Sequence, residues 1–188
     1  GNTVFVADEL GGWYWSALTG VMGEGENGVL QQPPHARARE MAEMLLDAGA
    51  DPNASQGLYN TMFTAGIEWL ELLLDRGLDA SNSVFPGRDE QKTLDYQLSQ
   101  AVKSRLSDRV VLLLDHGADP AGTDRYSQRS NYENAVLAGS PGLADLLVRY
   151  GAEVVELAAG DRFMAAAMRG AENEVRALLD EDPELIAN

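Results

Sequence analysis

A phrase of about eight residues recurs along this chain, and it constrains the fold more than any other feature. In its fullest form it reads Leu-Leu-Asp-Ala-Gly-Ala-Asp-Pro, and its copies lie at residues 45–52, 73–79, 113–120, 147–153 and 178–183. The terminating glycines are separated by 28 (49 to 77), 40 (77 to 117) and 34 residues (117 to 151), and 31 more lead to Asp182 in the last, decayed copy. A phrase that recurs at such similar intervals predicts a series of similar units stacked on one another.

Each copy is a helix-end signal. The paired leucines end an amphipathic helix, the glycine three positions later permits the left-handed conformation that closes it, and Asp-Pro starts an extended turn. A partner helix should precede each of these outer helices. The predicted outer helices lie near residues 37–48, 67–76, 107–116, 141–150 and 172–180, and the predicted inner helices near 16–23, 57–63, 90–103, 130–138 and 160–169. Small residues such as Ala135 and Ala165–Ala167 permit the inner helices to stack closely.

The phrase LLDAGADPN resembles the end of the outer helix in an ankyrin repeat, and the resemblance covers about Ser16 to Ile186. It implies an all-α ankyrin-repeat solenoid in a single domain, residues 1–188, with hairpin fingers between the repeats. The family's inner-helix opening, Thr-Pro-Leu-His, whose hydrogen bonds knit neighbouring repeats, is degraded in this chain. Segments 16–27, 58–63 and 161–186 also resemble uncharacterised bacterial ankyrin-repeat proteins. The resemblance implies a β-like finger at 2–16 and about five helix-pair repeats at 16–48, 57–76, 90–116, 130–150 and 160–180.

The N-terminal segment departs from the repeat. Two β-prone runs, residues 3–7 and 13–16, flank a glycine-containing turn and predict a β-hairpin. Aromatic side chains on a projecting finger are typical binding anchors, but aromatic bulk also covers the end of a stack, and both interpretations stay open. The candidate binding residues of this region and of the following inner helix are Phe5, Asp8, Glu9, Trp13, Tyr14, Trp15, Tyr59 and Phe63.

Two further departures lie in loops. Residues 24–34 form a Gly-, Gln- and Pro-rich insertion, which predicts a solvated loop. Residues 84–90 lengthen one finger, and residues 121–131 make the next one polar. The candidate binding residues of that polar finger are Asp124, Arg125, Tyr126 and Arg129, since arginine recognises carboxylates well. The alternative is that Asp124 pairs locally with an arginine and merely fixes the finger.

Charge and hydropathy limit the partners. The chain has 14 Lys and Arg against 30 Asp and Glu, a formal charge of −16. Such a surface repels phosphate and anionic lipid, so we expect no nucleic acid and no membrane partner. It favours a protein partner of basic character, or serves solubility alone. No apolar run approaches the ~18 residues of a membrane span, and the predicted location is cytoplasmic.

Catalytic and metal-binding patterns are scarce. The sequence has no cysteine and only two histidines. His116 precedes a terminating glycine, where a cation complements the helix end, and His35 follows Pro34 at a predicted exposed helix start. No nucleophile elbow, phosphate-binding loop, dinucleotide fingerprint or zinc spacing is present, so no catalytic residue, metal or cofactor is predicted.

The leading hypothesis is a protein-binding module that uses its concave face of fingers and inner helices. A narrower version is an inhibitor or immunity protein against a basic toxin or nuclease. A contrasting class is a small-molecule binder or enzyme, with an aromatic-lined pocket near the N-terminal hairpin and Asp8 or Glu9 as a buried carboxylate. A structural spacer within a longer chain is a third possibility.

Overall fold

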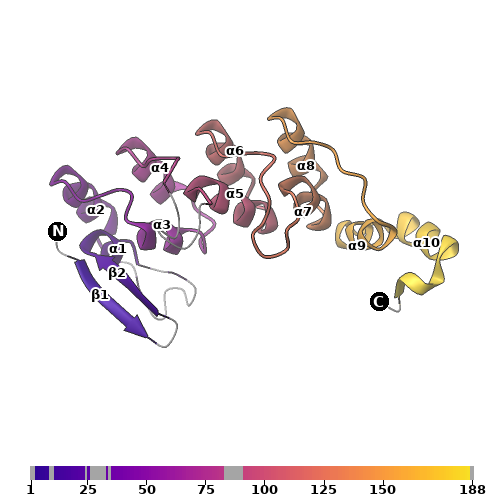
Figure 1. Ribbon diagram of the computed structural model, residues 1–188, viewed down its shortest axis with the longest axis horizontal. Helices are drawn as coiled ribbons and strands as arrows, with labels where there is room; N and C mark the ends of the chain where they lie inside the picture. The colour runs from indigo at the N-terminus through magenta and orange to yellow at the C-terminus, as the bar shows by residue number, and fades with distance from the viewer. Residues whose placement is uncertain are drawn as a thin grey trace. The chain divides into compact units, whose positions relative to one another are not determined.

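The computed structural model describes the backbone of residues 3–8, 11–23, 25, 33, 35–82 and 91–186, and the side chains among them from Trp15 onward except that of Ser55. The described residues form one β-hairpin and ten α-helices arranged in pairs (Figure 1). The chain divides into two compact units, residues 1–93 and 94–188, and each has its own core.

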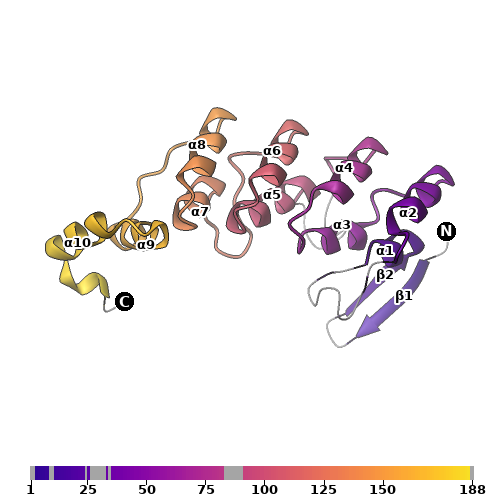
Figure 2. The same cartoon turned by 180° about the vertical axis from the view of Figure 1, so that it is seen from behind.

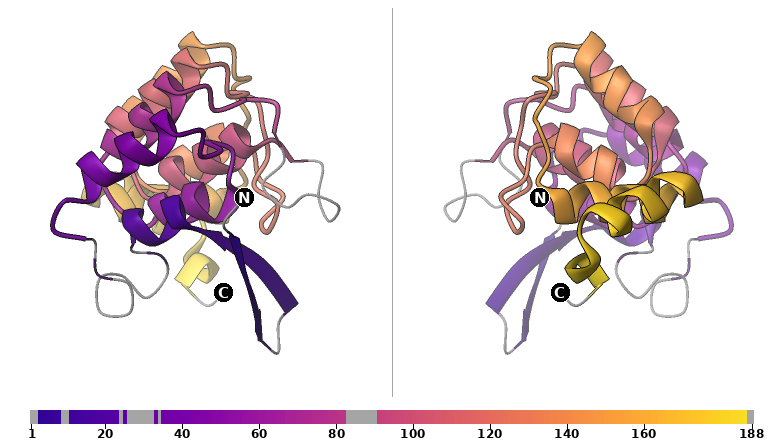
Figure 3. Two further views of the ribbon diagram at one scale, coloured as in Figure 1. Left: turned by 90° about the vertical axis from the view of Figure 1, so that its left-hand side faces the viewer. Right: turned by 90° about the vertical axis from the view of Figure 1, so that its right-hand side faces the viewer.

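The first unit begins with the hairpin and continues as two helix pairs. Strand β2 contacts α1 and α3, while α1 packs against both α2 and α3. The hairpin extends away from these helices in both end views (Figure 3). The elements of this unit are β1 (Thr3–Asp8), β2 (Gly11–Ser16), α1 (Ala17–Met22), α2 (Ala38–Asp47), α3 (Ser55–Thr61) and α4 (Glu68–Asp75).

The second unit holds three helix pairs and a short 3-10 helix, η2 (Pro183–Ile186). Helix α7 packs against α8 and α9, and η2 folds back onto α9 and α10. Seen from behind, α8 stands over α7, whereas α9 and α10 lie side by side (Figure 2). The helices are α5 (Thr93–Lys103), α6 (Ser107–Asp115), α7 (Asn131–Leu137), α8 (Pro141–Arg149), α9 (Ala159–Arg169) and α10 (Glu172–Glu181).

The predicted all-α repeat fold is confirmed, and each predicted inner and outer helix is present with its ends within three residues of the expected ones. The hairpin is also present, but its strands are longer than the sequence suggested. Asp8 pairs with Gly11 and Ala7 with Gly12, so both glycines belong to β2 and not to the turn. The insertion at 24–34 lies mostly, and the lengthening at 84–90 wholly, outside the described residues.

Four outer helices close in the same way. The residue after each terminating glycine donates its backbone N–H to the carbonyl five positions earlier, as in Ala50 to Leu45 (2.9 Å) and Ala118 to Leu113 (3.0 Å). This 6→1 bond is the closure of a Schellman motif, and it requires a left-handed residue one position before the donor. The left-handed glycines are Gly49, Gly77, Gly117 and Gly151, with φ of 91°, 91°, 88° and 112°. In the decayed copy, Asp182 is extended, with φ of −145°, and the chain enters η2 instead of a finger.

Inner helices of the second unit use the same closure. The backbone N–H groups of Leu106, Ser140 and Ala171 donate to carbonyls five positions earlier, over 2.9–3.0 Å. Gly139 and Gly170 supply the left-handed residue for two of them, but Arg105, with φ of 58°, occupies that position after α5. A non-glycine residue in this region carries strain, so α5 is held in place at a local conformational cost.

Neighbouring repeats are joined by hydrogen bonds to side chains other than those of the Thr-Pro-Leu-His opening. In the first unit, the Asp79 N–H donates to the side-chain oxygen of Asn53 over 2.7 Å. In the second, the Asp119 N–H donates to the Asp95 carboxylate over 2.8 Å, and the Ser99 hydroxyl to the amide oxygen of Asn131 over 2.8 Å. Stacking persists because these bonds take over the role of the degraded motif.

Small residues bring α7 and α9 close together. Ala135, Ala165 and Ala166 are buried, as their sequence pattern predicted. Beyond α7, a Cβ added to Gly139 would lie 2.9 Å from the backbone carbon and 3.0 Å from the backbone oxygen of Met168. Gly139 therefore serves two purposes, since it is left-handed and leaves room for the end of α9.

Replacing Gly139 with alanine tests this close approach. Gly139→Ala and Gly170→Ala both force alanine into the left-handed region, but a Cβ at Gly170 meets nothing within 4 Å. We expect Gly170→Ala to lower the free energy of unfolding by about 1–2 kcal/mol. Gly139→Ala should lower it by about 1–3 kcal/mol more, because the Met168 backbone must move. Urea unfolding measures both, and equal losses would contradict a close contact at Gly139.

Among the described residues, no helix is both long and apolar enough to cross a lipid bilayer.

Candidate protein-binding finger

The polar segment between α6 and α7 is the longest finger that the structure describes completely. In Figure 1 it forms a loop that extends below α5 and α7. Thr123 and Ser130 form an antiparallel bridge, and the Asp124 N–H donates to the Arg129 carbonyl over 2.8 Å. Ser130 then starts α7 through a capping box with Glu133. We call residues 118–130 the finger.

Asp124 organises the finger from within. Its side chain is only 1% exposed, and one carboxylate oxygen accepts from Lys103 Nζ over 2.7 Å. The other accepts from the backbone N–H groups of Tyr126 (3.2 Å) and Ser127 (2.8 Å). Burial by itself would raise the pKa of Asp124, but the hydrogen bonds from Lys103 and Ser127 outweigh burial and hold the pKa below its ordinary value. Asp124 is thus a charged structural residue at neutral pH.

One face of α5 carries the finger. Tyr96, Ser99 and Lys103 lie three to seven positions apart, a spacing that places side chains on one helix face. Ser99 bonds Asn131, the first residue of α7 directly after the finger, and Lys103 bonds Asp124. Buried Tyr96 interacts with Tyr126 through a side-chain hydrogen bond, and burial followed by this bond raises the pKa of Tyr96. The finger therefore lies along α5.

Tyr126 is presented to solvent at the tip of the finger. Its side chain is 69% exposed. The Lys103 ammonium lies 5.9 Å from the ring centroid and the Arg125 guanidinium carbon 5.4 Å, both within the range of cation–π attraction. The ring is therefore exposed but held in place by its neighbours.

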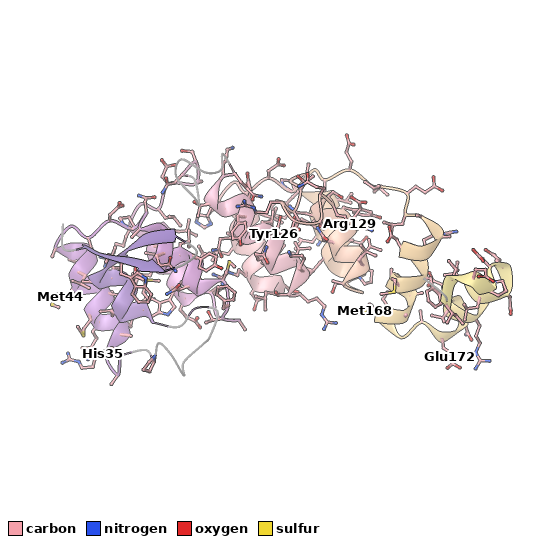
Figure 4. All side chains as sticks on the ribbon, turned by 60° about the horizontal axis from the view of Figure 1, so that its bottom comes forward. His35, Met44, Tyr126, Arg129, Met168 and Glu172 are labelled. Atoms are coloured by element: carbon pink, nitrogen blue, oxygen red, sulfur yellow. The ribbon has the colours of Figure 1, made fainter. Side chains whose placement is uncertain are left out.

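A second anchor ties the finger to α9. Arg129 makes two hydrogen bonds to Asp161, over 2.7 and 3.0 Å. Such bidentate pairs fix direction as well as distance. Arg129 also lies 3.9 Å from Glu133 in α7. Figure 4 shows Tyr126 and Arg129 near one another, away from the edge where Met168 lies.

The structure brings together the four residues predicted in this finger, but they play different parts. Asp124 is buried, and its cation is Lys103 and not an arginine, which corrects the expected pairing. Arg129 pairs with Asp161, Tyr126 is exposed, and Arg125 is half-buried beside the Tyr126 ring. A role in binding stays a prediction for all four.

Sequence reasoning missed Lys103, Tyr96 and Asp161. Tyr96 and Lys103 belong to the predicted inner helix at 90–103, where neither residue type suggested a contact with the finger. Asp161 was interpreted only as a helix start. The one available signal was the seven-residue spacing of Tyr96 and Lys103, which places a phenol and an ammonium on one face. That spacing is common in helices and does not indicate a finger that packs on them.

The predicted residues of the first unit are only partly described. Tyr59 and Phe63 form an edge-to-face pair with ring centroids 5.2 Å apart, and Phe63 is exposed. Trp15 lies opposite Val4 in the hairpin and is half-buried. The side chains of Phe5, Asp8, Trp13 and Tyr14, and all of Glu9, lie outside the described residues. The predicted aromatic pocket with a buried carboxylate stays a prediction.

The histidines have structural explanations. His116 is exposed at the end of α6, where its Nδ1 lies 2.8 Å from the Leu112 carbonyl oxygen. His35 is exposed, and its Nδ1 accepts from the Arg37 N–H over 3.0 Å. Within the described parts of the chain, no group of three or more acidic and histidine side chains is placed to hold a metal ion.

Comparison with known proteins addresses the fold. No protein-family model matches the chain, and no curated protein matches it. The crystal structure of the ankyrin repeat domain of Bcl-3, described as a unique member of the IkappaB protein family, aligns with a TM-score of 0.51 and 26% identity over 76% of this chain. This fold is an ankyrin-repeat solenoid. The alignment spans 64% of the Bcl-3 chain, so this solenoid matches only part of its neighbour.

Removing the charge of Asp124 should loosen the finger. Asp124→Asn keeps the shape but weakens the bonds from Lys103, Tyr126 and Ser127, so the free energy of unfolding at pH 7 should fall by about 1–3 kcal/mol. Because the folded pKa is depressed, this stabilisation is complete above the unfolded value of about 3.9 and is lost as pH falls through the folded pKa. The difference from wild type should therefore be constant from about pH 5 to 8 and shrink below about pH 4.

Denaturant unfolding across this pH range measures the effect. Asp119→Asn is the control, since Asp119 is exposed and its carboxylate accepts from the Ala121 N–H. We expect it to change stability by less than about 0.5 kcal/mol. A difference between wild type and Asp124→Asn that persists unchanged at pH 3 would mean that the carboxylate charge does not hold the finger.

Proposed function

We propose that this solenoid binds a protein partner and anchors it on Tyr126 of the finger. The ankyrin-repeat fold in itself supports a protein–protein interaction module. The observation that carries the specific proposal is an exposed aromatic side chain on a loop that is fixed at both ends. Tyrosine supplies a large contact area with few torsions, and tyrosine is enriched among the residues that dominate binding energy.

Preorganisation supports the same proposal. Asp124 fixes the backbone of the finger onto α5, and Arg129 fixes it onto α9. Gln128 adopts a left-handed conformation with φ of 58°, and its N–H donates to the Asp124 carbonyl over 2.8 Å. Strain of this kind persists only where the surrounding bonds enforce it. A loop that is already ordered loses less entropy when it binds, so more of the contact energy becomes affinity.

The net charge of −16 bears on how a partner approaches. A strongly acidic body attracts basic proteins over about a Debye length and accelerates their association. A partner of net basic character, such as a basic toxin or nuclease, is therefore part of the proposal. The bacterial source and the cytoplasmic location predicted from the sequence stay predictions.

Binding should depend on Tyr126 and not on exposed tyrosines in general. Protein fragments displayed on phage and selected on the immobilised chain provide a ligand, whose dissociation constant is then measured by calorimetry. Tyr126→Ala should weaken binding by about 30-fold, the effect of losing about 2 kcal/mol at a dominant contact.

Tyr150→Ala is the matched control. Tyr150 is also exposed, at the end of α8, where its hydroxyl bonds Asp115 over 2.5 Å. Tyr150→Ala should change the dissociation constant by less than about threefold, because Tyr150 lies outside the finger. Equal losses for both variants, or no loss for Tyr126→Ala when circular dichroism shows it folded, would disprove the anchor.

A further inference from the structure

We infer that the exposed face of α9 binds a basic amphipathic helix of a partner protein. This surface is separate from Tyr126, which lies away from the edge where Met168 lies (Figure 4). The inference therefore goes beyond the proposed function, and neither depends on the other.

The exposed face of α9 is apolar. Its residues are spaced by four, three and one positions, which places them on one side of the helix. They are Gly160, Met164, Ala167 and Met168, and we call them the methionine face. All four are exposed, Met164 by 54% and Met168 by 51%. Ala165 and Ala166, on the other side of α9, are buried. The second unit thus leaves one side of this inner helix without a covering element.

The repeat register shows what this side of an inner helix does. Met164 and Met168 lie seven and three positions before the residue that closes α9, as Ser99 and Lys103 do in α5. In α5, Ser99 bonds α7 and Lys103 bonds the finger, so this side receives the element that follows. In α9 both polar side chains are replaced by methionine. The same place in α9 is therefore suited to an apolar partner and not to a polar finger.

The shape of the methionine face fits a helix. It extends over about 12 Å, roughly two helical turns. A Cβ added to Gly160 would meet nothing within 4 Å, so the surface is open beside the methionines. Rows of side chains on a second helix pack into hollows of this kind. Methionine is flexible and adapts to different apolar side chains, as in grooves that bind amphipathic helices.

Charge decides the character of that helix. Residues 151–186 contain nine Asp and Glu against three Arg, so about a fifth of the chain carries −6 (3 − 9) of the −16 charge. Two of these arginines are already paired, Arg169 with Glu174 and Arg176 with Glu172. Six exposed carboxylates of this described range form no ion pair within the described residues, and they are Glu153, Glu156, Asp180, Glu181, Asp182 and Glu184.

These carboxylates lie around α9. Glu153 and Glu156 precede α9 in the chain. Two residues join α9 to α10, and so short a connection makes packed helices antiparallel, which returns the acidic end of α10 toward the start of α9. The acidic η2 also contacts α9. Lys and Arg beside the apolar stripe of a partner helix fit this arrangement. A second copy of this chain does not, because like charges would meet.

Methionine methyl NMR on the intact chain tests the inference, because the chain has six methionines. The probe is a Leu and Lys peptide of about five helical turns whose leucines occupy one face. The methyl signals of Met164 and Met168 should shift until they saturate. The signal of Met44, which is 59% exposed on α2, is the control in the same spectrum and should not shift. A scrambled peptide of the same composition should bind about tenfold more weakly or worse.

Substitutions test the apolar contact directly. Met164→Ser combined with Met168→Ser should weaken binding of the Leu and Lys peptide by about tenfold or more, because apolar burial is lost. Met44→Ser and Tyr126→Ala should each leave the dissociation constant within about twofold.

The acidic residues have a matched control of equal charge. Glu181→Gln combined with Glu184→Gln should weaken binding by about threefold or more. Glu40→Gln combined with Glu43→Gln removes the same charge from α2, where both carboxylates pair with arginines, and should weaken binding by less than about 1.5-fold.

Four results would overturn the inference. Equal shifts of the Met44 signal, or equal binding of the scrambled peptide, would mean that charge alone attracts the probe. Equal losses for the two glutamate pairs would mean that no local carboxylate takes part. Weaker binding by Tyr126→Ala would place the peptide on the finger. Shifts of Met164 and Met168 with protein concentration alone would show that a second copy covers the face. None of these results bears against Tyr126 as the anchor of the proposed partner.

Discussion

The five-residue closure that ends seven of the described helices, α2 and α4 to α9, is the constraint on which the rest of the structure depends. It ends a helix and turns the chain back in the same local way in both units, although the intervals between copies of the phrase vary from 28 to 40 residues. Its chemical requirement is one left-handed residue, which glycine meets at no steric cost. Where Arg105 takes that place, the surrounding packing enforces the conformation.

The finger depends on this regularity in turn. Because α5, α7 and α9 follow one another in repeating order, side chains from three successive inner helices are within reach of one loop. Lys103 comes from α5, Glu133 from α7 and Asp161 from α9, and all three pair with residues of the finger. A loop whose own sequence is polar and rich in turn residues thus acquires a defined shape from the scaffold below it.

Much of the scaffold was predictable, because a helix end is a local event. Leu113, Leu114 and Gly117 lie within one turn, so their types and spacing predict where α6 stops. The length of β2 was less predictable, since glycines in a paired strand have the composition of a turn. The closure at Arg105 could not be predicted from the sequence, because arginine as a residue type does not indicate a left-handed backbone.

The sequence predicted which region forms the candidate site, but not which residues hold that region in place. The polar composition of residues 121–131 indicated a distinctive finger. The partner of Asp124 is 21 residues away in sequence, and the partner of Arg129 is 32 away. Such pairings are decided by the stacking of repeats, and local pattern contains no information about them. Burial of Asp124 likewise follows from α5 lying beneath it, which a sequence of exposed residue types does not suggest.

The two anchors of the finger also have a mechanical meaning. A partner that pulls on Tyr126 pulls at once on α5, through Asp124 and Lys103, and on α9, through Arg129 and Asp161. Tension on a partner bound as proposed would therefore be distributed over neighbouring repeats instead of peeling a single loop from the surface.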